Sequence, residues 1–150
     1  MAAGKTVLAT GAFDLLHPGH IRFLEESKKT GGARAKLIVV VARDSTVQKR
    51  KGRKPILPEE QRRQIVQSLK PVNKAILGHQ EIDLLGILAQ YKPDIVCVGH
   101  YQNDIKKAVA KIITKEKLPI KLVQLAHYGP AGLNSSTSLK KRVLKSIARS

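Results

Sequence analysis

The sequence predicts an α/β fold: a doubly wound, Rossmann-like parallel sheet with helices on both faces, which makes an α/β/α sandwich. Two observations lead to this prediction. Short apolar runs alternate with helical segments along the chain, and Lys36–Ala42 (KLIVVVA) is apolar after its first residue. An uninterrupted apolar run is typical of a parallel strand that helices cover on both faces. Strands that alternate with helices form βαβ units, and such units build a parallel sheet.

The first elements are marked by the residues at their ends. A strand is expected at Lys5–Thr10, and after a short turn a helix is expected over 18–30. Proline is tolerated in the first turn of a helix, so Pro18 suits its start, and Gly31 suits its end. The second strand is the apolar run Lys36–Ala42.

The rest of the chain continues the alternation. A basic stretch at 49–54 is followed by a helix expected over 58–69, with Glu59 and Glu60 in its first turn, where acidic side chains are favourable. The remaining elements are strand Lys74–Leu77, helix 80–91, strand Asp94–Gly99, helix 104–117, strand Ile120–Leu125, a Gly- and Ser-rich loop at 129–138 and helix 138–149. Ligands of a doubly wound sheet bind beyond the carboxyl ends of its strands, where the strand order reverses. The loops after the first and fourth strands are therefore the expected site.

Length and composition fit a single domain, residues 1–150, with anionic partners. Twenty-eight Lys and Arg against eleven Asp and Glu give a net charge of +17, which favours nucleotides, nucleic acid or phosphorylated metabolites as ligands. An aromatic content of 3% argues against the stacking surfaces of single-strand binders. No apolar run approaches the roughly 20 residues of a membrane span, and no secretory signal is recognisable. We therefore expect a cytoplasmic protein with no membrane partner, and leave a homodimer open.

The most specific motif is His17-x-Gly19-His20, at the start of the helix that follows the first strand. Side chains three apart in the first turn of a helix lie on one side of it. The free N–H groups and partial positive charge of a helix N-terminus bind phosphate, and Gly19 has no side chain to keep a polyphosphate from the backbone. The motif predicts a cradle for NTP phosphates, in which both imidazoles stabilise charge that develops during in-line attack.

The segment Ala9–His20 (ATGAFDLLHPGH) resembles the opening of the cytidylyltransferase-like superfamily, which includes glycerol-3-phosphate cytidylyltransferase and phosphopantetheine adenylyltransferase. The resemblance implies catalytic roles for His17 and His20. It also implies transfer of a nucleotidyl group from an NTP to a phosphate-bearing acceptor, with release of pyrophosphate. A divalent metal such as Mg²⁺ is expected with ATP, and no residue is assigned as a metal ligand.

Further segments look like the archaeal FAD synthase family, which transfers AMP from ATP to FMN. They are VARDS (41–45), KGRKPI (51–56), PEEQRR (58–63), AILG (75–78) and LNSSTS (133–138). The resemblance thus spans nearly the whole chain and implies ATP and FMN as substrates. The alternatives are CTP with glycerol-3-phosphate and ATP with phosphopantetheine. A basic nucleic-acid-binding protein is the less favoured third alternative, because it leaves the histidine motif unexplained.

The resemblance also implies which residues bind each substrate. The expected nucleotide-binding residues are Gly11, Ala12, Phe13, His17, Pro18, Gly19, His20, Arg62, Tyr101, Asn103, Asp104, Tyr128, Ser135, Ser136 and Thr137. The expected acceptor-binding residues are Asp14, Lys51 and Arg53. We expect the basic run 49–54 to close over the triphosphate as a mobile lid, with a solvated loop as the alternative.

Several of these residues also have an ordinary structural interpretation. Hydroxyl groups before the last helix cap its N-terminus, Asp14 suits a turn, and Arg62 could lie on a helix surface. The segment Gly99–Gln102 (GHYQ) departs from the Gly-Tyr-Asp-Gln that is usual in the family, because Tyr101 stands in place of the aspartate. The low aromatic content further predicts that aliphatic side chains line most of the flavin slot.

Overall fold

A five-stranded parallel sheet forms the centre of the computed structural model, which describes residues 4–79, 83–128 and 135–149. The strands are β1 (Thr6–Gly11), β2 (Lys36–Val41), β3 (Lys74–Leu77), β4 (Ile95–Val98) and β5 (Lys121–Gln124). Their spatial order is β3-β2-β1-β4-β5, and every neighbouring pair is parallel. The strand order therefore reverses at β1, as predicted, and the site is expected beyond the carboxyl ends of β1 and β4.

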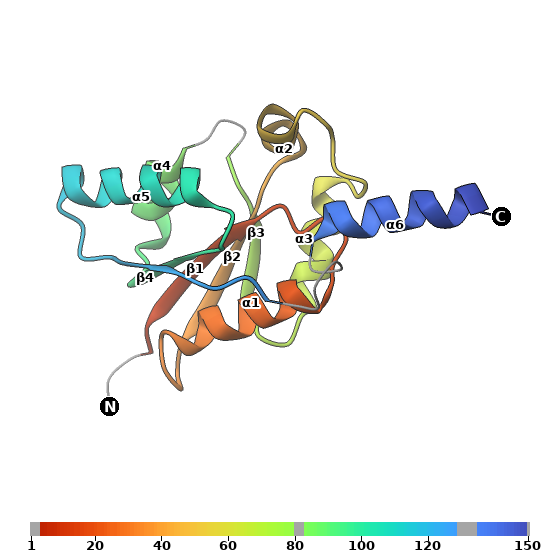
Figure 1. Cartoon of the computed structure of the whole chain (residues 1–150). Coiled ribbons are helices and arrows are strands. Elements are labelled where there is room, and N and C mark those ends of the chain that lie inside the picture. Colours follow the sequence, from red (N-terminus) through yellow and green to blue (C-terminus); the bar gives the residue numbers. More distant parts are fainter. Residues whose placement is uncertain (1–3, 80–82, 129–134, 150) are drawn as a thin grey trace.

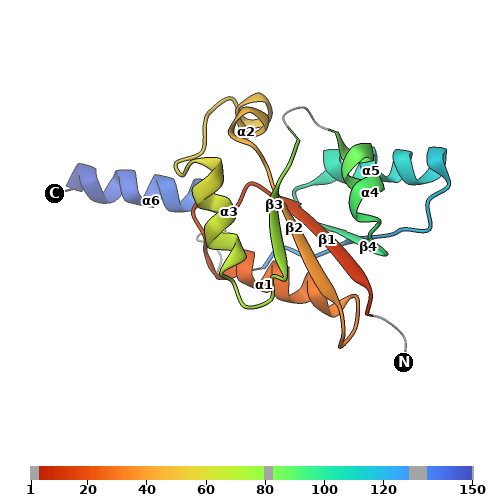
Figure 2. The same cartoon turned by 180° about the vertical axis from the view of Figure 1, so that it is seen from behind.

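Helices cover both faces of this sheet, so the predicted α/β/α sandwich is confirmed (Figures 1 and 2). They are α1 (Pro18–Lys29), α2 (Asp44–Lys51), α3 (Glu59–Gln67), α4 (Leu84–Tyr91), α5 (Asn103–Glu116) and α6 (Ser136–Arg149). Helices α1 and α3 lie on one face, and α4 and α5 lie on the other. Both faces of the central strands are therefore covered, which explains why their sequences are apolar without interruption.

The core follows from the alternation of side chains along the strands. Val7 and Ala9 of β1 point to one face and pack in a cluster with Leu24 of α1. Leu8, between them in sequence, points to the other face and packs in a cluster with Ile87 of α4. Burial of each Val, Leu or Ile side chain in these clusters stabilises the fold by about 1.5–3 kcal/mol.

The basic stretch differs from the loop that the sequence predicts. Residues 49–51 form the last turn of α2, where cationic side chains are favourable at the negative end of the helix. The helix ends at Gly52, whose φ of 75° is left-handed and is reached by glycine without strain. The lysines and arginine at the end of α2 are thus held by a helix, and only the part after Gly52 is a loop.

Helix α6 projects from the body of the protein and meets it through its first two turns (Figures 1 and 2). Its second half exposes Val143, Leu144 and Ile147. Among the described residues, no helix combines the length and apolarity that crossing a membrane requires.

Candidate active site

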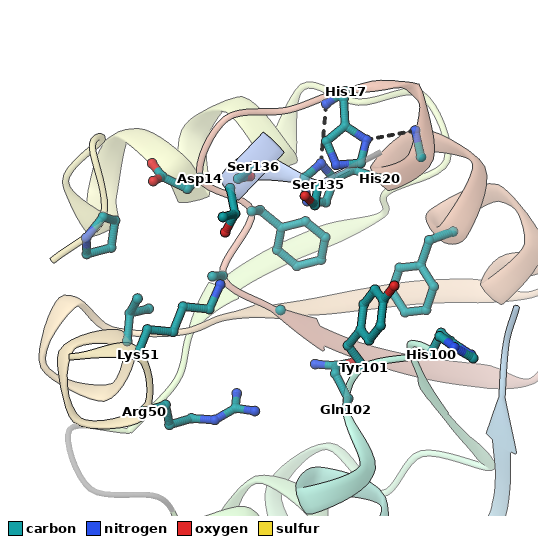
Figure 3. A pocket seen from close by; sticks show the side chains of 18 of the residues that line it. Asp14, His17, His20, Arg50, Lys51, His100, Tyr101, Gln102, Ser135 and Ser136 are labelled. Carbon is teal, nitrogen blue, oxygen red and sulfur yellow. Dashed lines mark hydrogen bonds between the residues drawn. The ribbon is translucent and has the colours of Figure 1, made fainter. Parts of the chain in front are cut away.

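A pocket of about 330 Å³ opens at the carboxyl ends of β1 and β4. Its walls come from the loop between β1 and α1, from α2, from the loop after β4 and from the start of α6 (Figure 3). Of the residues expected from the sequence, it brings together Gly11, Ala12, Phe13, Asp14, His17, Gly19, His20, Lys51, Arg53, Tyr101, Tyr128, Ser135, Ser136 and Thr137. Segments more than 100 residues apart in the chain thus meet around one cavity.

The two histidines of the motif lie against each other at the N-terminus of α1. Their ring centroids are 4.0 Å apart, and both rings line the pocket. His17 Nδ1 accepts a hydrogen bond from the Gly19 N–H at 3.0 Å, and His20 Nδ1 accepts one from the His17 N–H at 3.3 Å. These two bonds form a capping box made by histidines, which satisfies backbone N–H groups that a helix start leaves free.

The capping bonds also fix the tautomer of both rings. A neutral imidazole has one N–H donor and one acceptor nitrogen, and here Nδ1 is the acceptor in His17 and in His20. The hydrogen of each neutral ring is therefore on Nε2. Each histidine can offer one Nε2–H to an anionic ligand in the pocket.

Both histidines are held neutral. Burial, as the largest cause, and then the charges of His17 and Lys51 together lower the pKa of His20 to about 3, against the opposing effect of Asp14. Burial also lowers the pKa of His17, with a smaller contribution from His127. At neutral pH the pair can therefore act as hydrogen-bond donors and not as cations.

Close packing explains two residues of the motif segment. A Cβ at position 19 would collide with the backbone oxygen of Tyr128 and would lie 2.7 Å from His17 Cε1, so Gly19 allows this loop to pass next to α1. Phe13 has a φ of 52°, which is unusual for a residue with a side chain, and its ring fills the space beside Gly11. Positive φ at a non-glycine residue is frequent at functional sites, where the surrounding structure maintains the strain.

The hydroxyl groups at the start of α6 make hydrogen bonds within the fold and also line the pocket. Ser135 Oγ accepts a hydrogen bond from the Ser138 N–H at 3.1 Å, as a helix cap does. Ser136 Oγ donates to the Leu15 oxygen at 3.0 Å and so ties α6 to the motif segment. Thr137 Oγ1 accepts from Arg53 Nη2 at 3.0 Å. All three line the pocket, so the capping and binding interpretations are compatible.

Comparison with known proteins agrees with this geometry. The family described as cytidylyltransferase-like matches residues 8–142. The chain belongs to this family. It is 47% identical to the FAD synthase of Methanobrevibacter smithii, over 94% of this chain and 92% of that protein. It is 44% identical to the FAD synthase of Methanopyrus kandleri, over 95% and 93% respectively.

A solved structure supports the fold as well. The crystal structure of a lipopolysaccharide core biosynthesis protein from Thermoplasma volcanium has a TM-score of 0.76 and is 40% identical, covering 85% of this chain and 100% of that one. The resemblance to the cytidylyltransferase-like superfamily and to archaeal FAD synthases, which the sequence predicts, is confirmed.

Arg62 requires a correction, because the structure does not bring it to the pocket. The side chain is fully buried, and Nε donates to the Leu57 oxygen at 2.9 Å. Nη1 donates to the backbone oxygens of Ala12 and Ala42 at 2.6 and 2.8 Å, and Nη2 donates to Asp44 Oδ1 at 2.7 Å. With its donors used in this way, Arg62 joins the segments behind the pocket, and its side chain does not line the cavity.

Three further residues lie outside the lining of the pocket. Asp104 pairs with Arg50 at 2.8 Å, and Asn103 Oδ1 accepts from Gln124 Nε2 at 2.9 Å, and neither side chain lines the cavity. Pro18 starts α1 and faces a different hollow on the protein surface. Gln102 lines the pocket instead, and its side chain joins β4 to β1 through bonds to the Gly99 N–H and the Thr10 oxygen.

The aromatic side chains gather at the pocket, whereas aliphatic side chains were expected to line most of a flavin slot. The chain has only three Tyr and two Phe, and four of these five, Phe13, Phe23, Tyr101 and Tyr128, line the pocket. His100 and His127 stand beside Tyr101, with parallel rings whose centroids are 6.0 Å apart. A low aromatic content of the whole chain therefore says nothing about the pocket, because the few rings are concentrated there.

Sequence reasoning missed several residues of the site. They are Arg50, His100, His127 and Lys140, which all line the pocket. Arg50 and His100 lie within segments that the sequence does single out, the basic run 49–54 and Gly99–Gln102, but neither was named as a binding residue. Lys140 is the least visible of them, because a lysine in an amphipathic helix is ordinarily a surface residue.

Proposed function

We propose that this protein is an FAD synthase, which transfers the AMP group of ATP to the phosphate of FMN and releases pyrophosphate. The observation that carries the proposal is its similarity to FAD synthases of eight archaea, at 40–47% identity over more than 90% of this chain. The geometry of the pocket fits the reaction.

In the reaction, a phosphate oxygen of FMN attacks the α-phosphorus of ATP. A bond forms between them while the bond from the α-phosphorus to the bridging oxygen breaks, and its electron pair leaves with pyrophosphate. Negative charge grows on the oxygens of the transferring and departing groups. The Nε2–H groups of His17 and His20 are donors suited to these oxygens, since they are neutral, fixed in tautomer and preorganised by the capping bonds.

The charge of the pocket suits two substrates that both carry phosphate. Among the described residues that line it, five have cationic side chains, Arg50, Lys51, Arg53, Lys54 and Lys140, and one, Asp14, has a carboxylate. The cations at the end of α2 lie across the cavity from the histidines (Figure 3). We propose that the reacting phosphates of both substrates lie between these two walls.

The rings at the pocket suit flat ligands. Tyr101 and Tyr128 come from the loops after β4 and β5, next to His100 and His127. Adenine and isoalloxazine are both flat and pack well on aromatic faces. Acceptors without a ring, such as glycerol-3-phosphate and phosphopantetheine, would make no use of this concentration of aromatic side chains.

The residues described give little support for a metal ion held by protein alone. They contain no group of three His, Cys, Asp or Glu side chains that could surround an ion. Asp14, the carboxylate in the pocket, already accepts two backbone N–H bonds and contacts Lys140. Mg²⁺ is commonly bound mainly through substrate phosphates, and we propose that a divalent ion would enter on the oxygens of ATP.

A product assay tests the proposal. The protein is incubated with Mg²⁺ and ATP or CTP, and with FMN, glycerol-3-phosphate or phosphopantetheine as acceptor, and the products are separated by chromatography. We expect FAD from ATP and FMN, with stoichiometric pyrophosphate. Turnover only with another acceptor would assign the protein to that reaction. Salt-sensitive binding of nucleic acid without pyrophosphate release from any pair would instead favour a nucleic-acid-binding role.

The place of action and the assembly remain part of the proposal. We propose that the protein acts in the cytoplasm, where ATP and FMN are available, as one domain. A homodimer is expected to show as twice the 16.5 kDa chain mass in light scattering after gel filtration.

A further inference from the structure

We propose that Lys140 of α6 binds a substrate phosphate in this active site, and that Asp14 holds its ammonium group in place before substrates arrive. This inference rests on the proposed nucleotidyl transfer. It adds a residue that neither the motifs nor the family resemblance single out.

The place of Lys140 in α6 directs its side chain to the pocket. It follows Ser136 by four residues and Thr137 by three, so the three side chains lie on neighbouring positions of one helix face. All three line the cavity. The Lys140 side chain is only 19% exposed, although the second half of the same helix is exposed to solvent.

Asp14 is fixed independently of Lys140 and can therefore act as its support. Its two carboxylate oxygens accept hydrogen bonds from the Ile56 and Leu57 N–H groups, each at 2.9 Å. Lys140 Nζ lies 2.7 Å from Asp14 Oδ2. Burial alone would raise the pKa of Asp14, but the bonds from Lys140 and from the two backbone N–H groups outweigh it and lower the pKa. The carboxylate thus stays charged and keeps the ammonium group at the wall of the pocket.

The surroundings of this ion pair contain more positive charge than Asp14 can balance. Lys51 of α2 is partly buried nearby, and its pKa is lowered by burial and then by the charges of Lys140, Arg50 and Arg53. Two ammonium groups from two different helices therefore repel each other at a cavity for which the described residues provide one carboxylate, Asp14. An anion between them would relieve this repulsion, and phosphate is the anion that both proposed substrates carry.

The role assigned to Lys140 is electrostatic. It retains its protons while the acceptor oxygen bonds to the α-phosphorus and pyrophosphate departs with the electron pair. Its charge would offset the negative charge of a phosphate group beside His20 and Lys51. A charged donor of this kind strengthens binding by about 10- to 100-fold when its hydrogen bond is made.

The test compares Lys140→Ala with Lys141→Ala, which removes the same charge from the exposed neighbouring position on α6. The first readout is the Kd of inorganic tripolyphosphate, measured by calorimetry on the folded protein. The second is kcat and KM for ATP and for FMN. We expect Lys140→Ala to weaken tripolyphosphate binding or to lower kcat/KM by about 10- to 100-fold, and Lys141→Ala to change either by less than about twofold. Lys140→Arg should restore most of the loss, because it returns the charge.

A purely structural role would give a different pattern. If Lys140 only attaches α6 to Asp14, Lys140→Ala would lower Tm while the folded variant keeps the wild-type tripolyphosphate affinity and kcat/KM. Equal effects of Lys140→Ala and Lys141→Ala on both readouts would also overturn the inference. A variant that fails to fold is replaced by Lys140→Met, which keeps the aliphatic stem and removes the charge.

Failure of the inference and failure of the proposed function can be told apart. If the wild-type protein makes FAD, and Lys140→Ala loses no more tripolyphosphate affinity or kcat/KM than Lys141→Ala, the role of Lys140 is refuted and the function stands. The function would be refuted if the wild-type protein made no FAD. In that case the phosphate site would still stand if Lys140→Ala bound tripolyphosphate more weakly than wild type and Lys141→Ala did not.

Discussion

Arg62 Nη1 donates a 2.6 Å hydrogen bond to the Ala12 oxygen, so a fully buried guanidinium of α3 supports the loop that leads to the two histidines. The same nitrogen bonds to the Ala42 oxygen, and Nη2 contacts Asp44. The loop after β1, the end of β2 and the start of α2 therefore share one anchor. A charge buried in this way is stable only while its partners remain in place.

Replacement of Arg62 by Ala is expected to lower the free energy of unfolding by about 3–5 kcal/mol, because it leaves Asp44 and buried carbonyl groups without their donor. Urea denaturation measures the loss. The matched control is Arg63→Ala, at the next position of α3, where the side chain pairs with Glu60 at the surface. A surface ion pair contributes little, so this variant should lose far less stability. Equal losses in the two variants would contradict the anchoring role.

Replacement of His17 or His20 by Ala is expected to lower kcat by about 10²–10³-fold and to weaken ATP binding much less. The reason is that each Nε2–H stabilises charge that is largest in the transition state, and one preorganised donor contributes about that factor. Steady-state kinetics with equilibrium binding of ATP separates the two effects. His79→Ala, which removes an imidazole outside this pocket, should leave kcat unchanged. Histidine variants with near wild-type turnover would exclude the catalytic role.

The neutral state of His20 predicts a loss of stability in acid. Its pKa is about 3 in the folded protein and near 6.5 in an unfolded chain. Unfolded protein therefore binds the proton first as pH falls, so the contribution of His20 is complete above about pH 6.5 and is lost progressively from there towards pH 3. Urea denaturation at pH 7.5 and at pH 5 measures the change, and the free energy of unfolding should fall less between these pH values for His20→Gln than for wild type. An equal loss of the free energy of unfolding in His20→Gln and in wild type would contradict the neutral state of His20.

Much of the fold could be predicted because it depends on local patterns. Apolar runs fixed the five strands to within one or two residues, and Lys74–Leu77 agrees at both ends. The expected loop at 49–54 was wrong in its first half, because a short helix crowded with charges has no apolar stripe to reveal it. The capping box of His17 and His20 was not foreseen either, because histidine is not among the preferred capping residues.

Site residues were predictable where a motif names them and unpredictable where tertiary packing decides. The sequence shows that Arg62 is a cation, but only the fold shows that backbone oxygens use its donors. The sequence could not identify Lys140 as a pocket residue, since nothing in an amphipathic helix distinguishes a lysine that faces a pocket from one that faces solvent. Concentration of the aromatic rings at one cavity likewise depends on which loops meet.

Tyr101 provides the last prediction, because the resemblance to FAD synthases implies an aspartate at its position. Its side chain is 71% exposed at the mouth of the pocket, and its ring meets those of His100 and His127 edge to face, at 5.0 and 4.7 Å. We expect the face of this ring to stack on a substrate ring, adenine or isoalloxazine. Stacking of a base on an aromatic side chain contributes about 1–3 kcal/mol. Tyr101→Ala should therefore raise the KM for ATP or for FMN by about 5- to 100-fold, with kcat nearly unchanged, because the ring does not touch the transferring phosphate.

Tyr101→Phe is the matched control, since it keeps the ring and removes only the hydroxyl group. Wild-type kinetics in Tyr101→Phe, together with a raised KM in Tyr101→Ala, would assign the effect to stacking. The substrate whose KM rises identifies the ring that lies on Tyr101. A loss in Tyr101→Phe as large as in Tyr101→Ala would show that the hydroxyl group makes the contact, as a polar substitute for the family aspartate. Unchanged KM values for both substrates in Tyr101→Ala would exclude Tyr101 from the binding site, which would then depend on the less exposed rings of Phe13, Phe23 and Tyr128.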